Sequence, residues 1–287
     1  MINTDKIQLN WPLTNVQIKG ILQKKGERVV YDIASDNGSF IMKVADESKT
    51  KNELAKELEI FDFLNANNFS NIPKLLKTIT GKNFIEDEGK FLIMMEKVEG
   101  IHPEPNPKTY AKLGKLVARL HSVKLYPHKT SFTFASELPK LKENIKKFPF
   151  GQEYKKLVDS VPNFDLFSHS LIHTDIAPLN VIEKKNSDII ILDWDDAGIG
   201  VSLFDLGFSL IQQFVWEDKE FFDEDSAKSF YSSYFSLRSL PEGEKEQIFQ
   251  AGLFYALMYL PYENYDKAWK RIKFALDNRE KIVSSIY

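Results

Sequence analysis

Three prolines within the eight residues Gly100–Pro107 divide the chain into two parts of different character. Proline fixes the backbone angle φ and has no N–H to donate, so this segment cannot continue a helix or a central strand. Short β-rich runs precede it, and longer patterns with helical spacing follow it. The sequence therefore predicts an α+β protein with two lobes, residues 1–99 rich in β-structure and residues 100–287 mostly helical.

The first part begins with two strands joined by a tight turn. Residues 29–33 and 40–44 are rich in β-branched and aromatic residues, and an Asp-Asn-Gly sequence typical of a hairpin turn lies between them. A helix is expected over residues 54–64, where leucine and phenylalanine recur at spacings of three and four, and a second hairpin over residues 84–95. In the second part, amphipathic helices are expected over roughly 136–160, 203–214, 226–237, 243–260 and 264–284.

Composition limits the class of protein. A net charge of −3 gives no general affinity for nucleic acid, and the absence of cysteine excludes a disulfide framework and thiolate metal sites. The longest apolar runs fall short of the ~20 residues that a membrane-spanning helix needs, and the N-terminal residues lack the apolar core of a secretory signal. We therefore expect a cytoplasmic protein without nucleic-acid or membrane partners, and no sequence feature indicates an oligomeric state.

One stretch of the second part has the layout of a phosphoryl-transfer centre. In His173-Thr174-Asp175, the aspartate is followed after five residues by Asn180 and after 18 residues by Asp193, which ends an apolar run. A carboxylate can orient an acceptor hydroxyl or take its proton, and an amide with a second carboxylate supplies the oxygen ligands that Mg²⁺ prefers. A His-x-Asp triplet alone is common, and Asp175 taken singly is also typical of a turn or an N-cap. The spacing of the three groups together favours catalysis.

These motifs, in this order, resemble those of the aminoglycoside phosphotransferase and choline kinase family, which shares the protein-kinase-like fold. Further segments resemble the family's lysine strand, its hinge strand, the first helix of its second lobe and an Asp-Leu-Gly triplet. They are Phe40–Val44, Phe91–Gly100, Leu113–His121 and Asp205–Gly207. The resemblance covers most of the chain. It implies a nucleotide-binding lobe over residues 1–99 and a catalytic, acceptor-binding lobe over residues 100–287.

The resemblance also implies a role for each motif residue. Asp175 would accept the proton of the acceptor hydroxyl or orient it, since positioning dominates a loose phosphoryl-transfer transition state. Asn180 and Asp193 would bind Mg²⁺. His173 and Asp205 would shape the catalytic loop by hydrogen bonding rather than take part in the chemistry.

The nucleotide phosphates are expected on the first lobe. Lys43 lies mid-strand between apolar residues. The resemblance places it on the α- and β-phosphates of ATP, with Glu57 of the following helix as its partner. Glu53, one turn earlier, is an alternative partner. Strand alternation that simply turns Lys43 towards solvent is the alternative to a functional role.

Backbone groups would complete the nucleotide site. The resemblance places the adenine edge on the backbone of Glu96 and Val98, and the phosphates near a loop around Gly26. That loop, residues 20–28, lacks a G-x-G-x-x-G pattern, so an ordinary hairpin turn explains it equally well. No Walker A motif is present, which disfavours the P-loop class.

Two features depart from the family pattern. The residue between the histidine and the catalytic aspartate is usually small, often glycine, whereas this chain has Thr174, whose branched side chain restricts the backbone. Asp195 makes the segment after Asp193 more acidic than usual. It would either stand behind the metal ligands or belong to the acceptor site.

The acceptor is the least constrained part of the prediction. Residues 161–225 hold fourteen Asp or Glu against three Lys, and aromatic residues are frequent in the second part, which together suit a cationic acceptor. A solvated acidic surface and ordinary core aromatics explain the same features.

We expect a small-molecule kinase that moves the γ-phosphate of ATP to a hydroxyl of an aminoglycoside, a choline-like amine alcohol or a sugar. A catalytically inactive nucleotide-binding module of the same fold is the alternative. A protein kinase is disfavoured, because only 12 residues separate Asp193 from Asp205.

Overall fold

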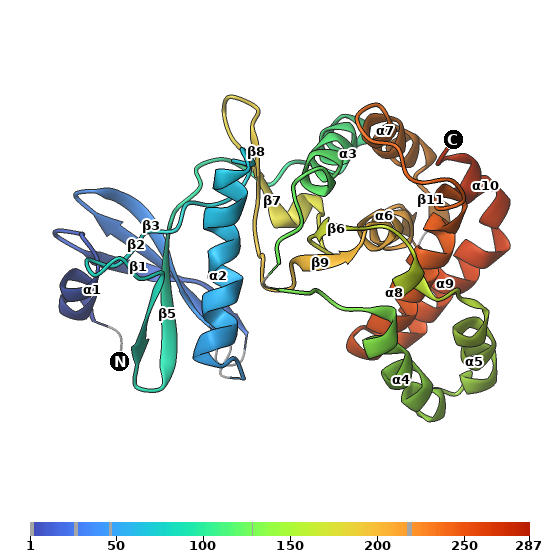
Figure 1. The fold of residues 1–287 in the computed structure, drawn as a ribbon, viewed down its shortest axis with the longest axis horizontal. Coiled ribbons are helices and arrows are strands. Elements are labelled where there is room, and N and C mark those ends of the chain that lie inside the picture. The colour runs from blue at the N-terminus through green and yellow to red at the C-terminus, as the bar shows by residue number, and fades with distance from the viewer. Residues whose placement is uncertain (1–2, 26–27, 46–47, 128, 217–219) are drawn as a thin grey trace. The chain divides into compact units, whose positions relative to one another are not determined.

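The structure, a computed structural model, describes residues 3–25, 28–45, 48–127, 129–216 and 220–287. The chain forms two compact units, Met1–Ile101 with Ile182–Leu192, and His102–Val181 with Asp193–Tyr287. The first unit holds an antiparallel sheet, and the second is mainly helical (Figure 1). The α+β class predicted from the sequence is confirmed.

The sheet of the first unit has five antiparallel strands in the order β1-β2-β3-β5-β4. The elements of this sheet and its helices are β1 Gln17–Lys25, β2 Arg28–Ser35, β3 Gly38–Val44, β4 Phe84–Asp87, β5 Lys90–Glu96, α1 Thr4–Asn10 and α2 Lys51–Ala66. Both hairpins expected from the sequence are present, because β2 pairs with β3 and β4 pairs with β5. Figure 1 shows α1 and α2 on opposite sides of the sheet.

Strand alternation gives each side of β3 its own role. Phe40, Met42 and Val44 are buried in a core that includes Ile7 of α1. Lys43 lies between these residues in sequence, so it points to the other side of the sheet, on which α2 lies (Figure 1). The alternation therefore places the lysine on the α2 side rather than in the apolar core.

Local sequence fixes the start of α2. Thr50 and Glu53 form a capping box, in which the Thr50 hydroxyl accepts from the Glu53 N–H (3.3 Å) and the Glu53 carboxylate accepts from the Thr50 N–H (2.8 Å). The apolar positions that predicted the helix are buried: Leu54, Leu58, Phe61 and Leu64. The helix expected over residues 54–64 is confirmed.

A further hairpin lies between the two candidate metal ligands in the sequence. It consists of β7 Val181–Glu183 and β8 Ile189–Ile191, and Ile182–Leu192 is compact with the first unit. Asn71 holds it there, since its side-chain amide donates to the Ile189 carbonyl (2.6 Å) and its own carbonyl accepts from the Ile191 N–H (2.9 Å). Asn180 directly precedes this hairpin, and Asp193 follows it.

Helices dominate the second unit. The α-helices are α3 Pro107–His121, α4 Phe134–Asn144, α5 Gly151–Ser160, α6 Leu203–Phe208, α7 Glu224–Phe235, α8 Ile248–Tyr259, α9 Tyr265–Asp277 and α10 Arg279–Ser284. Short 3-10 helices are Ile145–Lys147, Phe164–Leu166, Pro178–Asn180, Lys245–Gln247 and Leu260–Tyr262, and Ser209–Gln213 is a π-helical segment. Two small antiparallel sheets pair β6 His169–Ile172 with β9 Gly198–Val201, and β10 Val215–Trp216 with β11 Phe221–Phe222. In the described part of the chain, every helix is too short or too polar to cross a lipid bilayer.

The prediction of one continuous helix over residues 136–160 was wrong. Helix α4 ends at Asn144, and α5 begins only at Gly151. Pro149 lies in the gap, and it removes a backbone donor and disfavours helical geometry in the residue before it. The helix expected over residues 264–284 is likewise divided, at Asn278.

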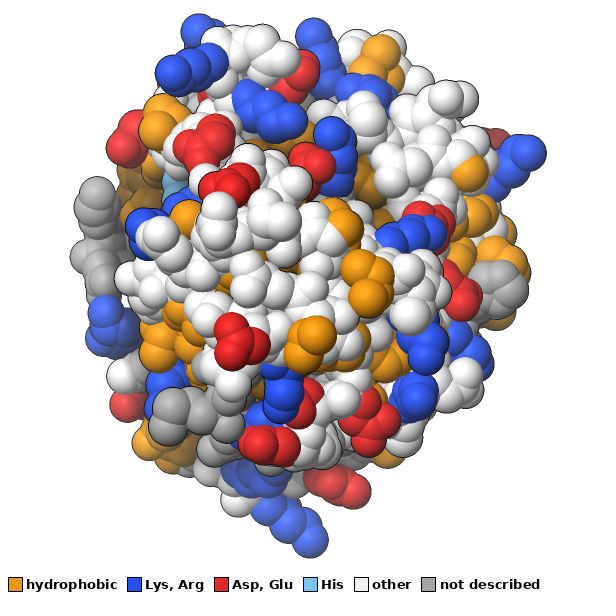
Figure 2. All heavy atoms as spheres, turned by 90° about the vertical axis from the view of Figure 1, so that its left-hand side faces the viewer, with side chains coloured by type: hydrophobic (Ala, Val, Ile, Leu, Met, Phe, Trp, Pro, Cys, Tyr) orange, Lys and Arg blue, Asp and Glu red, His pale blue; other side chains and the backbone are white. Residues whose placement is uncertain are grey.

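The molecule viewed from the left-hand side of Figure 1 has a mixed surface. Lysine and arginine side chains are interspersed with acidic ones, and hydrophobic side chains lie between them in small groups (Figure 2). The two signs of charge are mixed, which limits the electrostatic field over this face.

Candidate active site

The candidate catalytic loop, residues 173–180, follows β6 in the second unit. His173 and Thr174 are each 1% exposed, whereas Asp175 is exposed. The short helix Pro178–Asn180 brings the chain back, and the Asn180 amide Nδ2 donates to the Asp175 carboxylate Oδ2 (2.6 Å) and to the Asp175 carbonyl (3.0 Å). The two residues that the sequence singled out at a spacing of five are therefore in direct contact.

Asp205 of α6 holds the buried end of this loop. Its carboxylate Oδ2 accepts from the His173 N–H (3.1 Å) and from Nε2 of His121 in α3 (3.0 Å). The other oxygen, Oδ1, accepts from the Thr174 N–H (2.5 Å). One carboxylate thus joins α3, α6 and the loop. Asp205 therefore contacts the backbone of the loop directly, and its loop-shaping role stays a prediction.

Burial and hydrogen bonding determine the protonation states of Asp205 and His121. Burial opposes ionisation of Asp205, but the hydrogen bonds from His121 and the His173 backbone outweigh it and hold the Asp205 pKa below its usual range. Burial lowers the pKa of His121 despite the opposing effect of Asp205. We therefore assign a neutral His121, with Nε2–H donating to Asp205 and Nδ1 accepting from the Tyr234 hydroxyl (3.0 Å).

Thr174 has a left-handed backbone conformation, with φ at +75°. Branched residues rarely adopt it, whereas glycine does so without steric cost. Two hydrogen bonds hold the residue there: its N–H donates to Asp205, and its carbonyl accepts from the Tyr255 hydroxyl (2.6 Å). Thr174, where the family usually has a small residue and often glycine, thus lies at a backbone position that favours glycine, and this chain keeps the geometry with a threonine.

The environment of Asp175 raises its pKa to about 7. Desolvation is the largest cause, partly offset by the hydrogen bond from Asn180. The negative charges of Asp193, Asp196 and Asp205 raise it further. Because the side chain is exposed, water screens part of these effects. A carboxyl that titrates near neutral pH can both accept and release a proton there.

Asp193 follows β8 and is exposed, with a left-handed φ of +54°. The neighbouring Trp194 is 2% exposed, and its ring packs edge-on against the ring of His173, with centroids 4.9 Å apart. In turn, Nδ1 of His173 accepts from the Asp175 N–H (3.3 Å). The segments carrying Asp175 and Asp193 are therefore linked through one buried aromatic contact.

The acidic residues after Asp193 are held through their backbone. The Asp195 carbonyl accepts from the Lys129 ammonium, and the Asp196 carbonyl accepts from the Ser131 hydroxyl (2.8 Å). Asp195, for which the sequence left two roles open, is half-buried, whereas Asp196 is exposed. The charge of Asp196 acts on the pKa of Asp175, a role that the sequence did not indicate.

The donor atoms of Asn180 and Asp193 suit a magnesium ion. Asn180 uses its Nδ2–H groups on Asp175, which orients the amide and leaves Oδ1 as its acceptor atom. An amide oxygen and a carboxylate are hard donors, and Mg²⁺ commonly takes few protein ligands while it keeps waters and substrate phosphates. The residues present therefore fit this ion.

The candidate phosphate-binding residues lie in the first unit. Lys43 is half-buried in β3. Glu57 of α2 is 5% exposed and forms an ion pair with Lys49 (2.6 Å). The carboxylate of Glu53 caps the start of its own helix. Of the two candidate partners for Lys43, Glu57 is the buried one.

The candidate adenine-binding segment continues from β5. The Glu96 N–H donates to the Lys74 carbonyl (2.9 Å), so the Glu96 carbonyl is the group that this residue can offer to adenine. The Val98 N–H would be the matching donor, and Val98 is half-buried. Gly26, expected near the phosphates, lies outside the described residues.

A family model described as the phosphotransferase enzyme family matches residues 18–239. The chain belongs to this family. The match includes the candidate residues from Lys43 to Asp205, and it confirms the resemblance read from the sequence. No curated protein sequence matches this phosphotransferase.

Solved structures of several kinases are similar to this phosphotransferase. An amicoumacin kinase, in complex with AMP-PNP, Ca²⁺ and its ligand, has a TM-score of 0.70 at 17% identity, covering 98% of this chain and 92% of that one. A spectinomycin phosphotransferase, in complex with ADP and spectinomycin, has a TM-score of 0.65 at 15% identity, covering 98% and 95%. A microcompartment-associated aminopropanol kinase has a TM-score of 0.64 at 17% identity, covering 94% and 93%. At these identities the likeness shows the fold.

Tyr255 of α8 is a contact of this loop that the sequence did not indicate. It is a core aromatic, 1% exposed, which is one of the two readings left open for the aromatic residues, and its hydroxyl donates to the Thr174 carbonyl. Its helical spacing is that of a core aromatic. The partner lies 81 residues away, so no local pattern reports the contact.

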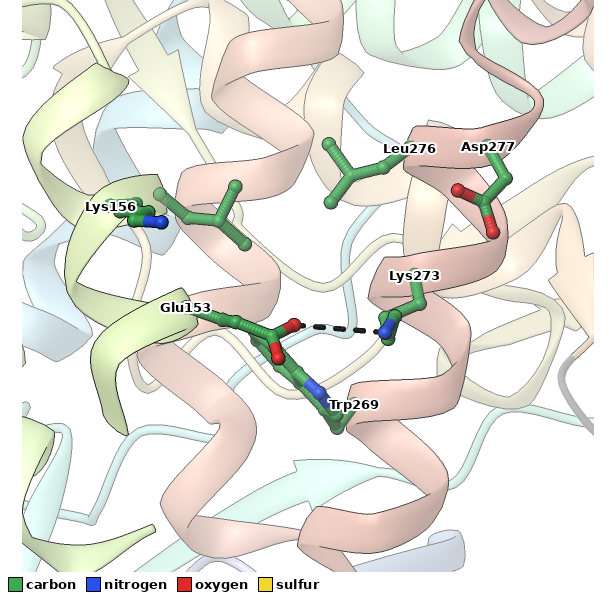
Figure 3. Close-up of a pocket in the computed structure, with 7 residues that line it drawn as sticks. Glu153, Lys156, Trp269, Lys273, Leu276 and Asp277 are labelled. Carbon is green, nitrogen blue, oxygen red and sulfur yellow. Dashed lines mark ion pairs between the residues drawn. The ribbon is translucent and has the colours of Figure 1, made fainter. Parts of the chain in front are cut away.

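A shallow pocket of about 180 Å³ lies between α5 and α9 of the second unit (Figure 3). Trp269 forms part of its wall, and Glu153 and Lys273 form an exposed ion pair beside it (3.6 Å). The residues that line it come from the two helices, and none belongs to the candidate catalytic loop or the Asp193 segment. We do not place the reaction there.

Proposed function

We propose that this phosphotransferase moves the γ-phosphoryl group of ATP to a hydroxyl of a small acceptor, with Asp175 as the catalytic residue. One observation carries the proposal: Asp175 is an exposed carboxyl with its pKa raised to about 7, oriented by an amide from Asn180 at 2.6 Å. Such a group suits an acceptor hydroxyl, which must be aligned with the phosphorus and must lose its proton.

In the proposed step, the acceptor oxygen forms a bond to the γ-phosphorus and gives its proton to an Asp175 carboxylate oxygen. The bond from that phosphorus to the oxygen bridging to the β-phosphate breaks, and ADP leaves. Because the transition state is loose, Asp175 contributes mainly by fixing the direction of the attacking oxygen. The Asn180 bond serves this purpose, because it restricts the carboxylate to one orientation.

We assign Mg²⁺ to Oδ1 of Asn180 and the carboxylate of Asp193. When bound, the ion neutralises charge that develops on the phosphate oxygens. Asn180 would then orient Asp175 with one end of its amide and bind the metal with the other. A positive charge at this place would also lower the pKa of Asp175 and so keep its carboxylate ionised.

For the nucleotide, we assign Lys43 to the α- and β-phosphates, with Glu57 as the buried acid that positions it. Its strand position on the α2 side of the sheet supports this assignment. The adenine edge would pair with the Glu96 carbonyl and the Val98 N–H. The loop around Gly26 stays a prediction for phosphate contact.

We assign separate roles to the two parts of the chain. Residues 1–99 would bind the nucleotide, and residues 100–287 would carry the catalytic loop and the acceptor site. Use of ATP as the phosphoryl donor is consistent with the cytoplasmic location expected from the sequence.

We propose an acceptor that carries a cationic amine as well as its hydroxyl. Spectinomycin, amicoumacin and aminopropanol are named for the structurally similar kinases. In this chain, Asp193 and Asp196 place negative charge close enough to raise the pKa of Asp175. Asp193 is assigned to the metal, so the exposed Asp196 is the charge that would attract an ammonium group near the attacking hydroxyl. An aminoglycoside and a choline-like amine alcohol both satisfy this condition, and a neutral sugar satisfies it less well.

The test is consumption of Mg²⁺-ATP with a panel of aminoglycosides, choline, ethanolamine, homoserine and simple sugars, with Asp175→Asn as the control. We expect one amine-bearing class to stimulate turnover, and the variant to lower kcat by roughly 10²–10⁴. An unchanged rate in the folded variant would end the assignment of Asp175. ATP binding without turnover across the panel would instead favour an inactive nucleotide-binding module.

A further inference from the structure

Thr174 is held at both of its peptide groups by helices that are far away in sequence. Its N–H donates to Asp205 of α6 (2.5 Å), and its carbonyl accepts from the hydroxyl of Tyr255 in α8 (2.6 Å). All three side chains are buried, with exposed fractions of 1–2%. A buried hydrogen bond has no water to replace it, so each partner is costly to lose.

The two helices approach closely enough to hold the same residue because they cross at a pair of glycines. A Cβ atom added to Gly207 of α6 would lie 2.3 Å from the backbone nitrogen of Gly252 in α8. Tyr255 comes three residues after Gly252, so it lies on the same side of its helix. The glycine of the Asp-Leu-Gly triplet therefore sets how near the Tyr255 helix lies to the Asp205 helix.

Neighbouring rings fix the direction of the Tyr255 side chain. Tyr259 stacks on it, with centroids 4.6 Å apart and planes 8° from parallel, and Phe208 meets it edge-on at 5.1 Å. Burial also raises the pKa of the Tyr255 phenol well above its usual range. The hydroxyl therefore stays protonated, and it donates to the Thr174 carbonyl.

The carbonyl that Tyr255 holds belongs to the peptide that leads into Asp175. With φ at +75°, Thr174 is under steric strain, and a threonine released from its partners would favour negative φ. A change of φ at Thr174 would rotate the following peptide and so redirect Asp175. Steric strain favours a negative φ at Thr174, whereas the hydrogen bond from Tyr255 stabilises the positive φ.

We infer that Tyr255 is a positioning residue of the reaction: its hydroxyl keeps Thr174 in the left-handed conformation and thereby fixes the direction of Asp175. The role in catalysis rests on the proposed function, whereas the hold on the loop does not. A chain with glycine in place of Thr174 would need this hydroxyl less, because glycine adopts the conformation freely. Tyr255 thus compensates for the threonine.

The first test is hydrogen–deuterium exchange of Tyr255→Phe, read at the amides of His173, Thr174 and Asp175. Tyr231→Phe is the matched control, since Tyr231 is also buried and donates to a backbone carbonyl, that of Leu206 (2.8 Å). We expect exchange of the loop amides to be about tenfold faster in Tyr255→Phe and unchanged in the control, with α3 protected in both. Unchanged loop exchange, or the same increase in both variants, would overturn the inference. The measurement needs no turnover, so its failure is separate from failure of the kinase assignment.

The second test uses the acceptor that the panel identifies. Tyr255→Phe is expected to lower kcat about tenfold while KM for ATP and acceptor stays the same, because positioning is lost and binding is not. In a Thr174→Gly background, the same substitution should lower kcat by no more than about twofold. Equal losses in the two backgrounds would contradict a role that works through the Thr174 torsion.

Discussion

Replacing Asp205 by asparagine tests the account of the catalytic loop most severely. The carboxylate accepts three buried hydrogen bonds, from the His173 N–H, the Thr174 N–H and His121. An asparagine can keep its single oxygen on only one side. Its NH₂ group must then face either the Thr174 N–H or the two donors on the other side.

The cost follows from what is lost and from what is left unpaired. At least one bond to an ionised acceptor disappears, worth about 1.5–3 kcal/mol, and a buried N–H then faces another donor, at about 1–3 kcal/mol more. We therefore expect Asp205→Asn to lower the free energy of unfolding of the second unit by roughly 3–5 kcal/mol. Asp165→Asn is the matched control: Asp165 also accepts two backbone bonds, from Phe134 (2.8 Å) and Ala135 (2.9 Å), but it is half-buried. It should cost about 1 kcal/mol.

The assay is urea denaturation followed by tryptophan fluorescence, because Trp194, Trp216 and Trp269 all belong to the second unit. The change of this stability difference with pH has a predictable direction. The pKa of Asp205 is lowered in the fold, so its stabilisation is complete above the ordinary aspartate value of about 3.9 and is lost as the pH falls through its lower folded value. The difference in free energy of unfolding between the wild type and Asp205→Asn should therefore become smaller at acid pH. Equal losses from Asp205→Asn and Asp165→Asn at neutral pH would refute the reasoning.

Three further predictions follow from the geometry. Because the pKa of Asp175 is raised to about 7, kcat/KM should fall as the pH drops below about 7, with a lower midpoint at saturating Mg²⁺; a flat pH–rate profile would count against a catalytic carboxylate. Gly207→Ala should cost at least about 1–3 kcal/mol in chemical denaturation, since its Cβ would lie 2.3 Å from Gly252, whereas Gly20→Ala meets nothing within 4 Å and should be neutral. Lys43→Met should weaken ATP binding about 10–100-fold in calorimetric titration, and an unchanged Kd would show that this lysine does not meet the phosphates.

The sequence indicated those features that depend on neighbouring residues. The spacing of leucines predicted α2, and the Asp-Asn-Gly turn predicted the hairpin of β2 and β3. Asp175 and Asn180 lie five residues apart, and a short helical turn is enough to bring them together. Such features follow from backbone periodicity and turn chemistry alone.

Contacts made by helix packing leave no local pattern in the sequence. A loop-shaping role for Asp205 was implied only by the family resemblance, and nothing indicated its partner His121, which lies 84 residues away. Tyr255 has the spacing of a core aromatic, and only the crossing of α6 and α8 brings its hydroxyl to Thr174. The division of the helix expected over residues 136–160 is different, because Pro149 was a visible signal against a continuous helix.

The most direct test of the central claim is to detect the phosphorylated acceptor itself. The wild type and Asp175→Asn would each be incubated with Mg²⁺-ATP and the amine-bearing acceptor that stimulates turnover, and the products would be read by ³¹P NMR. We predict a phosphate ester on the acceptor with stoichiometric ADP from the wild type, and a rate roughly 10²–10⁴ lower from the variant. Free phosphate in place of the ester, or an ester formed equally fast by both proteins, would contradict the account.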